Sequence, residues 1–252
     1  MEYQLGIVFT GGEGPHPQTI RRIVDRVYAA GTSVLLVAAD SGLMLAEAAG
    51  LKPDWIIGDM DSMDNEGRLC SYQAENVIRH PIDKDYTDTE LALSLLWEKG
   101  CPDAWITGGG GGRIDHLFGI RDLFEREHPP ARWLTAAEDI YCIDGNSAGN
   151  AAQGLTVTFN QDSPLTANSV VSVFPLGSGP WQAESTGLKW PLKGVCWERG
   201  LYGLSNVAVM PKIEINALRG RFMGIIQKER EEYYDSSTYR REGYCAEAPR
   251  ES

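Results

Sequence analysis

The sequence predicts an α/β protein, in which a Rossmann-like parallel-sheet domain is followed by a C-terminal antiparallel β-sandwich. Up to about residue 145, short apolar runs alternate with segments of helical spacing, which indicates a parallel sheet covered on both faces. Beyond about residue 150, short alternating strands are separated by glycine- and proline-rich turns, as in a small sandwich. The predicted parts are an α/β domain at 1–148, a sandwich at 149–228 and a charged tail at 229–252, expected to be disordered or a short helix.

Apolar runs and their periodicity locate the elements of the first part. The run 34–39 is continuously apolar, as a buried parallel strand requires. The helix at 87–99 has the clearest signals, because Thr87 and Glu90 fit a capping box and Gly100 ends the pattern. The predicted strands are 5–9, 34–39, 55–57, 77–78, 105–107, 132–135 and 140–143, and the predicted helices are 20–30, 43–49, 87–99 and 114–127. The strands expected in the second part are 155–159, 169–174, 207–210, 212–215 and 222–227.

Composition restricts the partners. The 252 residues carry a net charge of −12, which argues against a nucleic-acid or anionic-membrane partner. An anionic nucleotide is still possible, because metal ions and a few local cations can offset the field. Five scattered cysteines fit neither a disulfide framework nor a zinc site. With no signal peptide and no apolar stretch of about 20 residues, we expect a cytoplasmic protein.

Carboxylates follow several of the predicted strands directly. Asp40 follows one strand, and Asp59 and Asp61 follow the next, two residues apart. Ligands of an open parallel sheet bind beyond the carboxyl ends of its strands, so we expect these side chains to share one rim. Mg²⁺ prefers one or two carboxylates together with water and substrate phosphates. For any one of these residues a turn or a helix N-cap is the simpler explanation, but it accounts poorly for the whole set.

Two further segments add to this predicted rim. Gly108 to Gly112 precede a helix whose N-terminus suits a phosphate, although the segment matches neither a P-loop nor G-x-G-x-x-G. Arg113 suits a phosphate fork, whereas His116 is equally consistent with an ordinary helix residue. In the segment 84–90, capping explains Thr87 and Glu90 but leaves Lys84 and the density of acids unexplained.

In sequence order, these segments resemble the motifs of the thiamine pyrophosphokinase family. The matching segments are Ala39-Asp40-Ser41-Gly42, Gly58-Asp59-Met60-Asp61-Ser62, Lys84-Asp85-Tyr86-Thr87-Asp88-Thr89-Glu90-Leu91-Ala92-Leu93, Gly111-Gly112-Arg113-Ile114-Asp115-His116, Gly187-Leu188-Lys189-Trp190-Pro191-Leu192 and Ser205-Asn206. The resemblance runs to about residue 227. It implies a catalytic, ATP-binding α/β domain, a thiamine-binding sandwich, and a homodimer that holds thiamine between its subunits. It also implies transfer of pyrophosphate from ATP to the thiamine hydroxyl, with Mg²⁺ as cofactor.

The resemblance also assigns roles to individual residues. Asp59, Asp61 and Asp88 would be the catalytic and metal-binding carboxylates. The residues implied for the nucleotide are Asp40, Lys84, Thr87, Gly111, Gly112, Arg113, Asp115 and His116. Those implied for thiamine are Trp190, Thr186, Ser205 and Asn206, with the Trp190 indole facing the thiazolium cation. Two positions depart from the family pattern: Ser41 replaces a glycine, and Ile120 stands where asparagine is frequent.

Three alternatives stay open from the sequence. Trp190 can also be an ordinary core tryptophan of a sandwich. A related pyrophosphokinase could act on another hydroxymethyl heterocycle, such as a pterin, although a neutral ring gains less from an indole face. A non-catalytic nucleotide or thiamine sensor is the alternative from a different class, but it does not need two metal-ligand carboxylates in one loop.

Overall fold

A computed structural model of the chain describes residues 2–60, 69–145, 154–158, 165–166, 168–228 and 234–235. Its helices are α1 (Pro17–Ala29), α2 (Gly42–Ala48), α4 (Asp88–Glu98) and α5 (Ile114–Leu123), with a short 3-10 turn η1 (Ala74–Asn76). Its strands are β1 (Leu5–Thr10), β2 (Glu13–Gly14), β3 (Val34–Ala39), β4 (Trp55–Gly58), β5 (Val77–Arg79), β6 (Ala104–Gly108), β7 (Arg132–Leu134), β8 (Glu138–Asp144), β9 (Gly154–Thr158), β10 (Val170–Leu176), β11 (Gln182–Thr186), β12 (Gly203–Val207), β13 (Lys212–Arg219), β14 (Arg221–Gln227) and β15 (Tyr234–Asp235).

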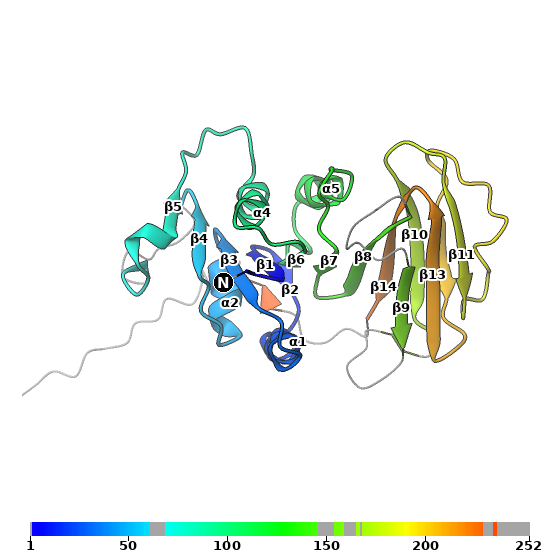
Figure 1. Cartoon of the computed structure of the whole chain (residues 1–252), viewed down its shortest axis with the longest axis horizontal. Coiled ribbons are helices and arrows are strands. Elements are labelled where there is room, and N and C mark those ends of the chain that lie inside the picture. The colour runs from blue at the N-terminus through cyan, green and yellow to red at the C-terminus, as the bar shows by residue number, and fades with distance from the viewer. Residues whose placement is uncertain are drawn as a thin grey trace, which may run out of the picture.

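A ten-stranded sheet runs through the molecule in the order β12-β10-β14-β8-β7-β6-β1-β3-β4-β5. The six strands from β7 to β5 are mutually parallel, and the remaining four are joined to β7 and to each other in antiparallel fashion. Helices cover both faces of the parallel part, with α4 and α5 above it and α1 and α2 below it in Figure 1. This mixed α/β architecture confirms the predicted fold class at that level.

Two buried clusters bind the helices to the parallel strands. On one face, Leu96 of α4 and Leu123 of α5 pack with Val8 and Ile106 of the sheet. On the other face, Ile20 and Val24 of α1 and Leu45 of α2 pack with Ile7 and Phe9. The amphipathic spacing that predicted these helices therefore supplies the residues that hold them on the sheet.

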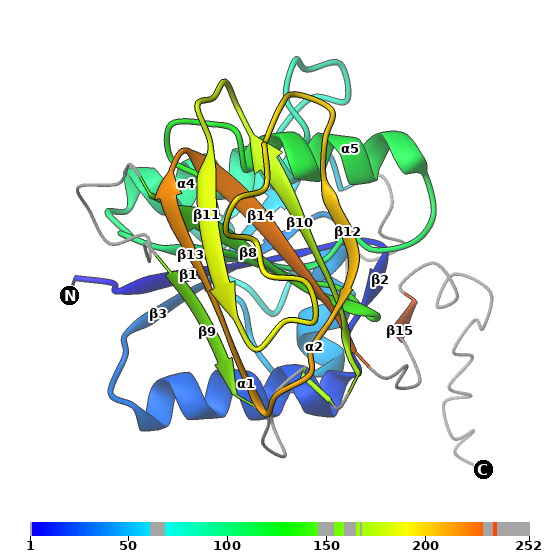
Figure 2. The same cartoon turned by 90° about the vertical axis from the view of Figure 1, so that its right-hand side faces the viewer.

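A second sheet of three antiparallel strands, in the order β11-β13-β9, packs on the antiparallel end of the large sheet. Figure 2 shows β11, β13 and β9 in front of β10, β14 and β8. The layer between them is filled by apolar side chains that include Val173, Ile213, Ile215, Phe222 and Ile226. The sandwich thus shares the ten-stranded sheet with the parallel part, because β14 pairs with β8 across the predicted boundary.

Most predicted elements are present, with shifted ends. The capping box at Thr87 and Glu90 is formed, and α1 begins at Pro17, three residues before the predicted start. The helix predicted to reach residue 127 ends at Leu123, and β12 precedes the strand predicted at 207–210. Strands β2, β11 and β15 were not predicted. The residues around the predicted domain boundary, 146–153, and most of the predicted tail lie outside the described residues. Within the described residues, no helix is long and apolar enough to cross a membrane.

Candidate active site

The carboxyl ends of the parallel strands form one edge of the sheet, and the polar residues predicted from the sequence lie along it. Asp40 follows β3, Asp59 follows β4 and the glycine run follows β6. Strands β6, β1, β3 and β4 are neighbours in that order, so these residues occupy adjacent positions along the edge. Asp61 lies outside the described residues.

The backbone is in an unusual conformation where two of these strands end. Asp40 has φ of 47° and Met60 has φ of 63°, in the left-handed region that non-glycine residues rarely adopt. The Asp40 N–H donates to the Ile57 carbonyl at 2.9 Å, which ties the end of β3 to β4. Such strained residues cluster at functional sites when the surrounding structure holds them in place.

Asp59 and Asp88 are brought close together by Lys84, although they come from different elements. The Lys84 ammonium lies 2.9 Å from Asp88 Oδ1 and 4.0 Å from Asp59 Oδ2. The Lys84 side chain is only 14% exposed, and those of Asp59 and Asp88 are 22% and 21% exposed. Asp88 Oδ1 is buried and accepts no hydrogen bond of good geometry among the described residues.

The electrostatics of Asp88 reflect this enclosure. Burial raises the pKa of its carboxyl, and the negative charges of Asp40 and Asp59 act in the same direction. The Lys84 ammonium opposes this rise without cancelling it. Among the described residues, no group of three or more His, Cys, Asp or Glu side chains could hold a metal ion. The predicted set of Asp59, Asp61 and Asp88 therefore stays a prediction.

Helix α4 holds Asp88 at its first position because of local sequence. Thr87 caps the helix: its hydroxyl accepts from the Glu90 N–H at 3.3 Å, and the Glu90 carboxylate accepts from the Thr87 N–H at 2.7 Å. The buried Thr10 and Thr89 hydroxyls, 2.7 Å apart, join the end of β1 to the first turn of α4. Sequence reasoning missed Thr10 and Thr89, whose only signal is a hydroxyl at the end of a strand and at a helix start.

Backbone hydrogen bonds tie the glycine run after β6 to the segment that follows β1. Gly110 exchanges two backbone hydrogen bonds with Glu13, at 2.7 and 2.9 Å, and Gly109 donates to the Gly11 carbonyl. A Cβ atom on Gly108 would lie 2.2 Å from the Thr10 carbonyl oxygen, which only glycine avoids. Gly112 has φ of 66°, and a Cβ atom there would meet nothing within 4 Å, so its backbone is open to a ligand.

The residues that follow the glycines do not contact the acidic pair in this structure. The Arg113 guanidinium donates two hydrogen bonds to the Asp115 carboxylate, at 3.1 and 2.5 Å, and both side chains are exposed. This ion pair lowers the pKa of Asp115. The His116 N–H donates to Asp115 Oδ1 at 3.0 Å. The three residues thus form an exposed polar group at the start of α5.

Both departures from the family motifs have a structural explanation. Ser41 has φ of −60° and lies directly before α2, so this position does not need glycine. Gly42 does need to be glycine, because a Cβ atom there would lie 2.1 Å from the Phe9 carbonyl oxygen. Ile120 is buried in the core, and its Cδ1 lies 2.4 Å from where a Cβ on Gly109 would be. Ile120 therefore supports the glycine loop by packing.

The residues predicted for thiamine lie in the antiparallel part. Asn206 of β12 is buried and holds the backbone of Trp190: its Oδ1 accepts from the Trp190 N–H at 3.1 Å and its Nδ2 donates to the Trp190 carbonyl at 2.6 Å. The indole of Trp190 is 54% exposed, with the Lys189 ammonium 4.6 Å from its ring centre. Trp190 is thus not the core tryptophan of the alternative explanation.

The other two residues predicted for thiamine, Thr186 and Ser205, each make a hydrogen bond to a neighbouring strand. The Thr186 hydroxyl donates to the Glu214 carboxylate at 3.3 Å. Ser205 has φ of 55°, and its N–H donates to the Ser172 hydroxyl at 3.2 Å. Around them, β12 and its flanking loops expose large apolar side chains: Val195, Leu201, Tyr202, Leu204, Val209 and Met210.

The two groups of predicted residues are far apart within one chain. Six strands separate β12 from β3, which makes seven spacings of about 4.8 Å and a distance of roughly 34 Å. Figure 1 places the two regions on opposite sides of the molecule. Trp190 and the acidic pair of the same chain therefore cannot contact one small ligand together.

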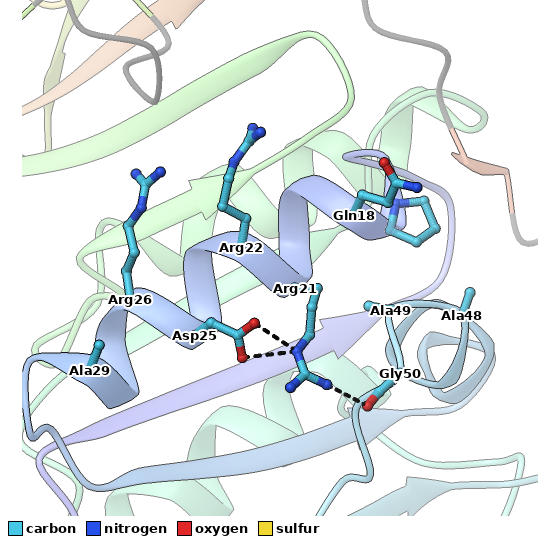
Figure 3. Close-up of a pocket in the computed structure, with 10 residues that line it drawn as sticks. Gln18, Arg21, Arg22, Asp25, Arg26, Ala29, Ala48, Ala49 and Gly50 are labelled. Carbon is cyan, nitrogen blue, oxygen red and sulfur yellow. Dashed lines mark hydrogen bonds and ion pairs between the residues drawn. The ribbon is translucent and has the colours of Figure 1, made fainter.

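Two pockets lie away from the acidic edge. A shallow space of about 670 Å³ runs along α1 to the end of α2. As Figure 3 shows, Arg21 there is held by Asp25 and the Gly50 carbonyl, while Arg22 and Arg26 extend to one side of α1. A second space of about 590 Å³ lies between α5 and β10. Neither pocket includes Asp40, Asp59 or Asp88.

Comparison with known proteins supplies the family. Residues 29–129 match the family model for the catalytic domain of thiamin pyrophosphokinase. A curated thiamine pyrophosphokinase from Bacillus subtilis (strain 168) is 35% identical over 86 residues. The resemblance to the thiamine pyrophosphokinase family is confirmed. The aligned segment covers 34% of this chain and 40% of the relative.

Solved thiamine pyrophosphokinase structures share the fold over most of the chain. The enzyme from Geobacillus thermodenitrificans has a TM-score of 0.63 and 25% identity, covering 89% of this chain and 97% of its own. The Bacillus subtilis structure has a TM-score of 0.66 and 20% identity, covering 89% and 99%. The Candida albicans structure has a TM-score of 0.61 and 16% identity, covering 89% and 90%. At such low identities, the last two matches are evidence for the fold alone.

Proposed function

We propose that this protein transfers the pyrophosphoryl group of ATP to the hydroxyl of thiamine, giving thiamine diphosphate and AMP. The observation that carries the proposal is the convergence of Asp59 and Asp88 on one cationic group at the carboxyl edge of the sheet. The family match over residues 29–129 includes these carboxylates and the glycine loop.

The reaction balances without a further reactant. The thiamine oxygen attacks the β-phosphorus, the bond from that phosphorus to the oxygen bridging to the α-phosphorus breaks, and AMP leaves with that oxygen. The hydroxyl proton passes to a carboxylate of the acidic edge. Catalysis of this kind depends mainly on positioning and on neutralising phosphate charge.

The donor set of the acidic edge fits Mg²⁺. Asp88 Oδ1 is buried and has no well-directed hydrogen bond among the described residues. The carboxylates of Asp88 and Asp59 both face the Lys84 ammonium. Asp59 and Asp88 would hold the ion, and Asp61 is proposed as a further ligand. When bound, the ion would neutralise charge on the triphosphate. Asp40 would support the same edge, because its charge acts on Asp88.

The nucleotide phosphates would lie along the glycine loop and the start of α5. The open Gly112 backbone and its neighbour Gly111 would donate N–H groups. The Arg113 guanidinium would leave Asp115 and bind a phosphate instead. Breaking the Arg113–Asp115 ion pair costs little free energy, because the pair is exposed to solvent. Asp115 and His116 would then orient the nucleotide, with Thr87 and Lys84 at the opposite end of the phosphate chain.

Thiamine would bind between two copies of the chain. The exposed Trp190 indole suits the flat thiazolium cation, and Asn206 fixes the Trp190 backbone. Thr186 and Ser205 would complete the thiamine contacts. Because β12, whose Asn206 holds the Trp190 backbone, lies seven strand spacings from β3, roughly 34 Å across the sheet, we infer that the edge that receives thiamine belongs to a second copy. The exposed apolar side chains around β12 would supply the homodimer contact.

Direct measurement of products tests the reaction. AMP and thiamine diphosphate should appear together, in equal amounts, from Mg-ATP only when thiamine is present. AMP formed with a pterin alcohol instead would retain the acidic-site chemistry and reject thiamine as acceptor. Binding of ATP without AMP formation from any acceptor would favour the sensor.

A mixing experiment tests the shared site. Asp59→Asn and Trp190→Ala homodimers should each be inactive, because every site contains one defect. After the two variants are unfolded and refolded together, half of the dimers are mixed, and each mixed dimer has one site free of both defects. About a quarter of wild-type activity should return. If mixing restores no activity although mixed dimers form, the site does not lie between subunits.

A further inference from the structure

We propose that Lys84 is an internal counter-ion: it occupies the cation position of the acidic edge before nucleotide binds, and transfers its ammonium to a phosphate when the metal enters. Metal alone would then bind weakly, and metal with nucleotide strongly. This inference rests on the proposed metal–nucleotide site and adds to it an order of charge exchange.

Geometry supports the first half of the proposal. Lys84 lies in the loop before α4, and its ammonium lies between carboxylates that follow β4 and begin α4. Its contact with Asp88 Oδ1 is 2.9 Å long, yet this oxygen has no well-directed hydrogen bond among the described residues. The ammonium therefore lies in the position where a hard cation would act.

Charge counting shows why the position needs a cation. The charges of Asp40 and Asp59 both act on Asp88, and the side chains of Asp59 and Asp88 are only 22% and 21% exposed. Ionised carboxylates so enclosed repel one another unless a positive charge lies among them. A divalent ion entering beside the ammonium would in turn be repelled by it. The site thus accommodates Lys84 or the metal, but not both in the same place.

The chemistry of lysine supports the second half. An ammonium on a flexible four-carbon stem can move by several ångströms without any change in the backbone. A triphosphate offers it a new anionic partner at the moment when the metal takes its carboxylates. Coupling of this kind is reciprocal, so the nucleotide should raise the affinity for metal by the factor by which metal raises the affinity for nucleotide.

Binding of Mn²⁺ alone, counted by electron paramagnetic resonance without nucleotide or thiamine, tests the proposal. Lys84→Met should bind Mn²⁺ about tenfold more tightly than wild type, a difference of about 1.4 kcal/mol. Lys84→Arg keeps the charge and should bind as weakly as wild type. Lys99→Met, which removes the same charge at the far end of α4, is the matched control and should also resemble wild type. Equal affinities for wild type and Lys84→Met, or equal gains in the Met and Arg variants, would overturn the proposal.

A second measurement needs no variant, in case Lys84→Met does not fold. Limited acetylation of wild type, followed by peptide mass spectrometry, should label Lys84 several-fold faster when saturating Mg²⁺ alone displaces its ammonium. Mg²⁺ with α,β-methylene-ATP should restore protection, because the ammonium then contacts a phosphate. Labelling that does not respond to Mg²⁺ would refute the exchange.

The two proposals fail in different ways. Neither metal titration nor acetylation involves turnover. If wild type forms thiamine diphosphate but the Mn²⁺ affinities are equal, only the role of Lys84 is refuted. If wild type forms no thiamine diphosphate while Lys84→Met binds Mn²⁺ more tightly, the counter-ion role stands and the proposed reaction fails.

Discussion

Replacing Asn206 tests how the antiparallel part presents Trp190. The Asn206 side chain is 5% exposed and makes three hydrogen bonds to backbone: it accepts from Trp190 N–H at 3.1 Å and Val207 N–H at 2.9 Å, and donates to the Trp190 carbonyl at 2.6 Å. At about 1 kcal/mol each, the loss of these bonds in Asn206→Ala would cost about 3 kcal/mol. Water can reach the exposed Trp190 segment, so we expect a loss of about 2 kcal/mol in the free energy of unfolding.

Urea denaturation by linear extrapolation measures this loss. Thr186→Val is the control, because Thr186 is exposed and makes one long hydrogen bond of 3.3 Å, so its effect should stay within about 0.5 kcal/mol. Asn206→Asp should not rescue stability, because it sets a carboxylate oxygen against the Trp190 carbonyl. The KM for thiamine should rise more than the KM for ATP in Asn206→Ala. A loss below about 0.5 kcal/mol would show that Asn206 does not hold Trp190 in place.

Two further predictions concern titratable groups. Burial acts to raise the pKa of Glu90, but hydrogen bonds from Thr87 and the Arg126 ion pair outweigh it, so the folded pKa lies below 4.5. The ionised Glu90 carboxylate therefore stabilises the fold above about pH 4.5, and this stabilisation is lost as the pH falls through its folded pKa. In urea titrations at pH 7, Glu90→Gln should lower the free energy of unfolding by about 1 kcal/mol. If the difference between wild type and variant were the same at pH 3, this reasoning would be refuted. Burial raises the pKa of the Cys101 thiol, and it raises the pKa of the Cys142 thiol to about 12. At pH 8, a thiol reagent should therefore label the exposed Cys70 and Cys196 much faster than these two buried thiols. Equal labelling rates for the exposed and the buried cysteines would contradict this prediction.

Much of the fold follows from local signals in the sequence. The continuous apolar run 34–39 became β3 with the predicted bounds, and the capping box correctly located the N-cap of α4 at Thr87. Both signals are local, since one depends on side-chain burial along a strand and the other on hydrogen bonds within one turn. The shifted strand near 207 shows the limit, because its pairing partner β10 lies more than 30 residues earlier in the chain.

The candidate site also has features that local sequence signals predict and features that depend on tertiary packing. Sequence alone determined which carboxylates follow which strands, because strand ends are local features and parallel strands align their carboxyl ends. Only the tertiary structure decided that Lys84 lies between Asp59 and Asp88, that Ile120 packs against the glycine loop, and that β12 lies seven strand spacings from β3. Those facts depend on the order of strands across the sheet and on side-chain packing between distant segments, neither of which leaves a pattern in neighbouring residues.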